Sequence, residues 1–79
     1  PPNAPLARSA EILTIYWQAI GVTPRPEWGE ETAFITMGLK LPHIKQVAER
    51  LNDAFGTRLV SSSLLPCKNA REVAALLAN

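Results

Sequence analysis

Hydrophobic positions recur at helical spacing in three separate stretches of this chain. In the first stretch, residues 9–20, one face would carry Ile12, Leu13, Tyr16, Trp17 and Ile20. This spacing is typical of an amphipathic helix with one buried stripe. Ser9 is a candidate N-cap, and Gly21 stands where a left-handed residue commonly ends a helix. The pattern therefore predicts a first helix over residues 9–20.

The second periodic stretch predicts a helix over about residues 42–54. Pro42 suits a first helical turn because its missing N–H has no helical partner there, and Gly56 is expected to end the helix. The apolar positions are Leu41, Ile44, Val47, Ala48, Leu51, Ala54 and Phe55. The outward face is expected to hold Lys45, Gln46, Glu49, Arg50, Asn52 and Asp53.

The third stretch follows a short apolar segment. Leu64 and Leu65 are expected to form a single helical turn that closes the core. Asn69 is a candidate N-cap for the last helix, and Glu72 three residues later completes a capping-box pattern. The buried stripe of that helix is expected to hold Val73, Leu76 and Leu77.

A long loop, residues 22–40, connects the first two helices. Loops of this length in a small domain are uncommon and are usually functional or pinned by buried side chains. We expect Phe34 and Met37 to be such anchors. Trp28 has two interpretations, either packing its ring on the domain or remaining partly exposed for a partner. No alternation typical of strands is present, so we predict an all-α bundle of three main helices and one short turn.

Composition supports a small folded domain. The chain has 79 residues, of which 47% are hydrophobic and 19% charged, which favours a globule over a disordered tail. The net charge of +1 argues against nucleic acid as a partner, and no apolar run is long enough to cross a membrane. Residues 1–8 are rich in proline and alanine, so we expect a linker there and one domain over residues 9–79, part of a larger polypeptide.

The titratable residues do not form a recognisable catalytic or metal-binding pattern. His43 has no second histidine or cysteine nearby in the sequence, so it does not predict a metal site. Glu27, Glu30 and Glu31 are typical of a solvated loop. Cys67 cannot form an internal disulfide because it is the only cysteine, and this fits a cytoplasmic protein. We therefore expect no enzymatic activity, no cofactor and no metal.

Several segments, in order, resemble the acyl and peptidyl carrier domains of polyketide and nonribosomal peptide synthases. ETAFITMG is similar to the acidic-x-x-Phe-x-x-Leu-Gly approach to their attachment site. RLNDAFGTRL resembles the exit from their second helix, and SSSLLPCKNAREVAALLA resembles their C-terminal segment. The spacing between Gly38 and Gly56 equals the usual spacing in polyketide-type carriers. The resemblance covers nearly the whole chain and implies the same helical fold.

The resemblance fails at the residue that gives carriers their chemistry. Those domains have Asp-Ser-Leu where this chain has Lys40, Leu41 and Pro42. The family's serine attacks coenzyme A and receives the phosphopantetheine arm, with the aspartate and a metal organising the step. Leu41 has no hydroxyl, and the positive charge of Lys40 would repel the metal. The resemblance therefore implies a degenerate attachment position at Leu41 and no phosphopantetheine.

The start of the second predicted helix is basic, whereas carrier domains often have an acidic second helix that docks enzymes. This basic face is either an interaction surface or a set of solvated charges. The candidate partner-binding residues are Lys40, Leu41, His43, Ile44, Lys45 and Trp28. The resemblance implies a non-catalytic domain that binds other domains or subunits of a biosynthetic assembly line. The alternatives are a working carrier with an atypical attachment site and an unrelated small helical module.

Overall fold

The computed structural model describes the backbone of residues 4–78 and side chains from Arg8 onward. Three main helices are present: α1 (Ala4–Ile20), α2 (Leu41–Phe55) and α4 (Ala70–Ala78). Two short elements lie between them, the 3-10 turn η1 (Phe34–Met37) and the single turn α3 (Ser61–Leu64). Residues 4–78 contain no strand, so the predicted all-α bundle with three main helices and one short turn is confirmed.

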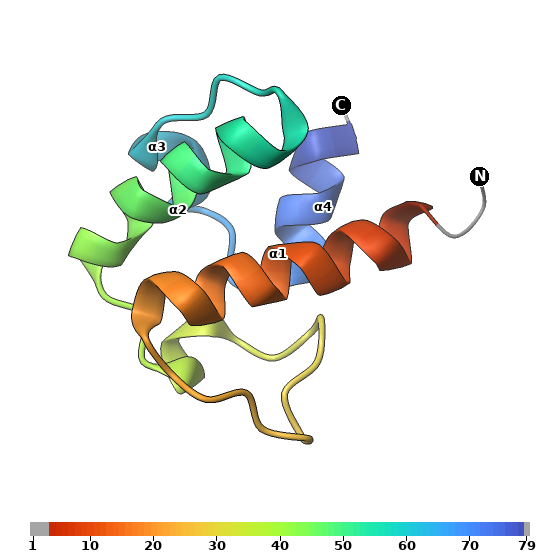
Figure 1. Ribbon diagram of the computed structural model, residues 1–79, viewed down its shortest axis with the longest axis vertical. Helices are drawn as coiled ribbons and strands as arrows, with labels where there is room; N and C mark the ends of the chain where they lie inside the picture. Colours follow the sequence, from red (N-terminus) through yellow and green to blue (C-terminus); the bar gives the residue numbers. More distant parts are fainter. Residues whose placement is uncertain (1–3, 79) are drawn as a thin grey trace.

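Helix α1 is the centre of the packing, since it contacts both α2 and α4, while α3 packs against α2 (Figure 1). The apolar stripes predicted from the sequence meet in one core. Its most deeply buried large side chains are Ile12, Tyr16, Phe34, Val47, Leu51 and Val73. Ala70, whose side chain is completely buried, is small enough to let the start of α4 approach its neighbours closely. The hydrophobic periodicity therefore identified most of the core-facing positions, except that Leu41 and Ala54, both predicted on the apolar face of the second helix, are exposed.

The ends of the helices follow the glycine signals. Gly21 and Gly56 have φ angles of 83° and 66°, in the left-handed region that glycine adopts without strain. Helix α2 begins at Leu41, one residue before the expected start, and Pro42 lies in its first turn. At α4, the Asn69 side chain accepts a hydrogen bond from the Glu72 N–H at 2.9 Å, which confirms the predicted cap.

The predicted start of α1 was wrong. Ser9 lies within the helix with only 4% of its surface exposed, and the helix begins at Ala4. Proline within a first turn costs no hydrogen bond, and leucine, alanine and arginine favour helix, so the helix extends through residues predicted to be linker. The side chain of Arg8 contacts the other helices, donating to the Leu77 carbonyl at 3.4 Å. The remainder of the predicted linker, residues 1–3, lies outside the described residues.

The side chain of Asn52 organises the connector between α2 and α3. Its Oδ1 accepts hydrogen bonds from the Leu59 N–H at 2.7 Å and the Thr57 hydroxyl at 2.8 Å. Its Nδ2 donates to the Leu59 carbonyl at 2.9 Å. The sequence pattern predicts Asn52 on the outward face of the helix. In the structure its side chain forms hydrogen bonds that hold the connector, residues 56–60, against the end of α2.

Aromatic stacking fixes the long loop to the bundle. The rings of Tyr16 and Phe34 lie 3.7 Å apart between centroids and are nearly parallel, at 7°. Met37, at the other end of η1, is also buried, and its sulfur accepts a hydrogen bond from Trp17 Nε1 at 3.3 Å. The prediction that Phe34 and Met37 anchor the loop is therefore confirmed.

Replacement of Asn52 by alanine should lower the free energy of unfolding by about 1–3 kcal/mol, because it removes three hydrogen bonds and leaves connector groups unpaired. Urea denaturation followed by circular dichroism measures this difference. The control is Gln46→Ala on the exposed face of α2, expected to change stability by less than about 0.5 kcal/mol. Equal effects of the two substitutions would contradict the role assigned to Asn52.

Alkaline conditions should destabilise the domain through Tyr16. Burial, and secondarily the nearby Cys67, raises the pKa of Tyr16 well above its usual range. In the unfolded chain Tyr16 loses its proton near pH 10, whereas the folded chain retains it. The folded state binds more protons there, so the free energy of unfolding falls as the pH rises above about 10. A Tyr16→Phe variant should lose less stability between about pH 9 and 11. Identical pH dependence in both proteins would show that Tyr16 contributes nothing.

Candidate partner-binding groove

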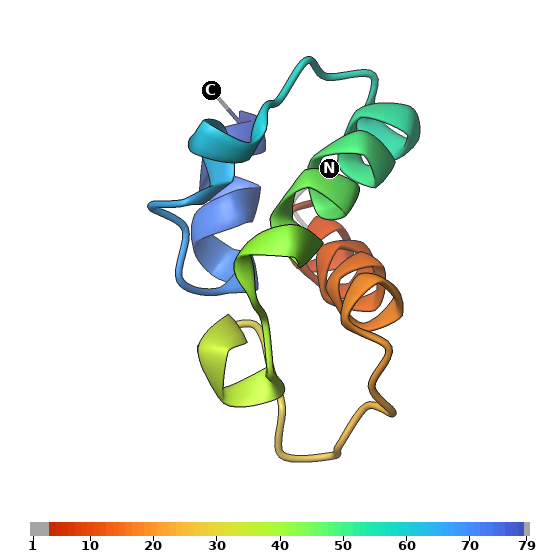
Figure 2. The same ribbon diagram turned by 90° about the vertical axis from the view of Figure 1, so that its left-hand side faces the viewer.

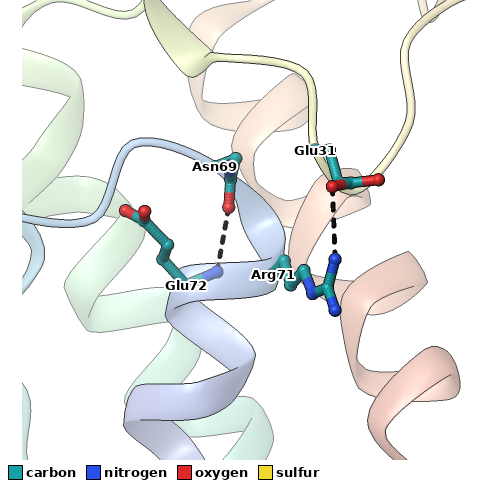
Figure 3. A network of polar contacts seen from close by, with 4 residues as sticks. All are labelled: Glu31, Asn69, Arg71 and Glu72. Atoms are coloured by element: carbon teal, nitrogen blue, oxygen red, sulfur yellow. Dashed lines mark hydrogen bonds and ion pairs between the residues drawn. The ribbon is translucent and has the colours of Figure 1, made fainter.

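Backbone hydrogen bonds join the end of the long loop to the start of α4. The Phe34 N–H donates to the Lys68 carbonyl at 2.8 Å, and the Arg71 N–H donates to the Glu30 carbonyl at 3.0 Å. The side chains of Arg71 and Glu31 form an ion pair at 3.2 Å, shown in Figure 3. Both partners of that pair are largely exposed, so it contributes little stability. The backbone bonds hold η1 beside the segment that links α3 to α4 (Figure 2).

This arrangement leaves a groove of about 540 Å³ between three parts of the chain. One side is formed by η1 and the residue before it, and another by Leu39, Lys40, Leu41 and Ile44 at and before the start of α2. The third side is formed by Leu65, Cys67 and Lys68 in the α3–α4 connector. Ile44 and Phe34 belong to the core and form the buried part of the lining.

The rim of the groove is formed by exposed aliphatic side chains. Ile35 is 81% exposed, Leu41 73% and Leu65 55%. Among the described residues only one other large hydrophobic side chain, Val60, is exposed to this degree. Single exposed apolar residues are ordinary on a protein surface, whereas several around one concave site mark an interaction surface. The groove is therefore the best candidate functional site in the described part of the chain.

The charged side chains that line the groove are both lysines. Lys40 is the residue before α2, and Lys68 belongs to the α3–α4 connector. The described lining contains no carboxylate. Glu72 lies next to this region, and its Oε1 accepts a hydrogen bond from the Lys68 N–H at 2.6 Å. The lining itself therefore combines an apolar surface with positive charge.

Half of the six predicted binding residues meet at this groove. Lys40, Leu41 and Ile44 line it, with Ile44 buried and Leu41 exposed. His43 and Lys45 are outside the lining. The Nδ1 atom of His43 accepts a hydrogen bond from the Lys40 N–H at 2.9 Å, so this side chain caps the start of α2.

Trp28 lies at a different place from the groove. It is half-buried against the core and borders a separate hollow with Met37 and Gly38. The guanidinium of Arg25 is 5.5 Å from the centroid of its ring, a cation–π distance. The structure thus favours the packed interpretation of Trp28 and separates it from the other predicted binding residues.

Sequence reasoning missed Ile35, Leu65 and Lys68. Leu65 was expected to close the core with Leu64, but Leu64 alone is buried and Leu65 follows the turn outward. Ile35 had a detectable signal, because the spacing of the buried anchors Phe34 and Met37 makes one turn and directs the residue after Phe34 away from the core. Lys68 gave no signal, since its place beside the groove depends on the fold.

The resemblance to carrier domains aligns Leu41 with their attachment serine. Leu41 is the first residue of α2, exposed and without a nucleophilic atom. The described residues contain no group of three or more His, Cys, Asp or Glu side chains able to hold a metal ion. They also contain no helix that is both long enough and apolar enough to cross a membrane.

Cys67 is a half-buried member of the groove lining. Its sulfur lies 4.0 Å from the Ser63 carbonyl oxygen. Burial, and secondarily the negative charge of Glu72, raises the pKa of the Cys67 thiol. A raised pKa reduces the thiolate fraction, and the thiolate is the reactive form. The reactivity of Cys67 is therefore expected to be lower than that of a free thiol, which makes it better suited as a reporter of the groove than as a nucleophile.

Comparison with protein-family models, curated proteins and solved structures finds no match to this chain. The resemblance to carrier domains consequently rests on the residues of the chain itself. The small helical bundle agrees with that resemblance but does not distinguish it from other helical modules.

Alkylation of Cys67 by iodoacetamide at pH 8 should be several-fold slower in the folded protein than in the denatured chain, because burial and Glu72 disfavour its thiolate. A Glu72→Gln variant should react faster than the wild type while remaining slower than the denatured chain. Mass spectrometry over time gives the rates. Equal rates for folded and denatured protein would contradict the environment described for Cys67.

Proposed function

We propose that this chain is a non-catalytic, carrier-like domain that works by binding another protein of a polyketide or peptide assembly line. The observation that carries the proposal is the groove rimmed by Ile35, Leu41 and Leu65. One of these side chains, Leu41, stands where the resemblance places the attachment serine. In this proposal a position that serves covalent chemistry in carriers serves contact with a partner instead.

The energetics of the rim favour a binding role. Covering a fully exposed leucine or isoleucine contributes about 1.5–3 kcal/mol, so a partner that buries the three rim side chains gains several kcal/mol. The isolated domain gains nothing from their exposure. Lys40 and Lys68 add positive charge near the rim. This charge favours an acidic partner over a basic one and helps to orient that partner as it binds.

The proposal excludes a phosphopantetheine arm on physical grounds. Transfer of the arm needs a hydroxyl placed at the attachment position, and Leu41 has none. Three other hydroxyl groups, those of Ser61, Ser62 and Ser63, lie in α3 and not at the start of α2. Thr36 lies in η1. In this proposal the domain works in the cytoplasm with the other parts of its assembly line and needs no cofactor.

Incubation of the domain with coenzyme A and a promiscuous phosphopantetheinyl transferase should leave its intact mass unchanged. The matched variant replaces three residues, Lys40→Asp, Leu41→Ser and Pro42→Leu, and so restores the carrier motif. This variant should gain the mass of one phosphopantetheine.

The wild type and the triple variant together distinguish the two ways in which the proposal could be wrong. Modification of the wild type would show a working carrier with an atypical site, and peptide mapping would locate the hydroxyl that received the arm. Failure of the folded triple variant to react would oppose the carrier resemblance itself and would favour an unrelated helical module. Circular dichroism of the variant establishes that it is folded.

A further inference from the structure

We propose that the groove binds an amphipathic α-helix whose apolar side chains are flanked by aspartate or glutamate. This inference rests on the proposed function only in that the domain acts by binding a protein. The sequence resemblance contributes nothing to it. The shape of the groove, the exposure of its rim and the sign of its charges favour such a partner.

The form of the groove selects a helix among the ways that proteins bind peptide segments. An added strand requires a free sheet edge, and residues 4–78 contain no strand. Recognition of a proline-rich segment requires exposed aromatic side chains, but the one aromatic residue in the lining, Phe34, is only 1% exposed. Recognition of phosphorylated motifs uses clusters of arginine, and the described lining contains none. A helix laid in an apolar groove, with anchors spaced at i, i+3 or i+4, and i+7, is the mode that an apolar lining with an exposed aliphatic rim fits best.

The exposure of the rim favours a macromolecule over a small apolar ligand. Sites for small ligands usually enclose most of the ligand surface. Here Ile35 and Leu41 are more than 70% exposed and stand on different elements, η1 and α2. A small molecule in the groove would leave much of these side chains in water. A helix contacting both elements and Leu65 would cover them together.

The charges define the chemistry of that helix. Lys40 and Lys68 come from different segments of the groove lining, and the described lining includes no carboxylate. Glu72, the acid adjacent to Lys68, keeps its negative charge while it accepts the hydrogen bond from the Lys68 N–H, so it partly offsets Lys68. Glu31 is already paired with Arg71. Acidic residues beside an apolar stripe would therefore meet positive charge, whereas basic residues would be repelled.

The test uses three synthetic peptides, each about 18 residues long so that a helix can form. The first has leucine at i, i+4, i+7 and i+11 with glutamate at the flanking positions. The second keeps the leucines and has lysine at the flanks. The third has the composition of the first in an order without an amphipathic face. Fluorescence anisotropy gives each Kd, and NMR chemical-shift changes locate the contact.

We expect the first peptide to bind at least tenfold more tightly than the other two, with shift changes at Ile35, Leu41 and Leu65. It should also slow alkylation of Cys67. Leu41→Ser should weaken binding at least tenfold, whereas Val60→Ser, at the exposed hydrophobic residue outside the groove, should not. Lys40→Glu with Lys68→Glu should reverse the preference between the acidic and basic peptides.

Several results would overturn the inference. These are equal binding of all three peptides, contacts mapped away from the groove, or no binding by the first peptide at millimolar concentration. Concentration-dependent dimerisation that Leu41→Ser abolishes would assign the groove to a second copy, and tight decanoate binding without peptide binding would assign it to a small amphiphile. The transferase test is independent of these results, so failure of the helix inference and failure of the carrier proposal are distinguishable.

Discussion

The stacking of Phe34 on Tyr16 is the contact on which the functional surface depends. It places a loop residue inside the helical core, with both rings about 1% exposed. The hydrogen bond from the Phe34 N–H to the Lys68 carbonyl then fixes the loop beside the α3–α4 connector. Together these two interactions hold η1, and with it Ile35, in the lining of the groove. Without them the helices would retain their own hydrogen bonds, but the groove would lose one of its sides.

Most of the fold was predictable because each main helix has a clear apolar stripe and two of them end at glycine. Ile12, Tyr16, Val47 and Leu51 are buried as their spacing required. The start of α1 was predicted at Ser9 because serine and nearby prolines are typical signals of a helix start. The contacts of Arg8 with the rest of the bundle favour a helix that begins earlier in the sequence. The role of Asn52 was not predictable, since periodicity describes which face of a helix is polar and not what a polar side chain binds.

The candidate site was only partly predictable for a different reason. Lys40, Leu41 and Ile44 follow one another closely in sequence, so local reasoning grouped them correctly. Leu65, Cys67 and Lys68 join them only after α3 and the connector have folded against the loop. His43 and Trp28 lie outside the groove lining, where His43 caps the start of α2 and Trp28 packs against the core, and a role for either in partner binding stays a prediction. None of these sequence patterns tests whether the groove binds a protein of an assembly line, so that function stays a proposal.

The contacts of Asn52 and those of Phe34 differ in the sequence separation of the residues that they join. Asn52 fastens residues that follow it almost immediately, whereas Phe34 joins positions distant in both directions along the chain. Closing long segments costs more conformational entropy, so the helices and the α2–α3 connector can form before the loop is seated. Regions held by few contacts also open first in the native state. A molecule that contacts both Ile35 and Leu65 would add a further connection between the loop and the α3–α4 connector and would stabilise the seated loop.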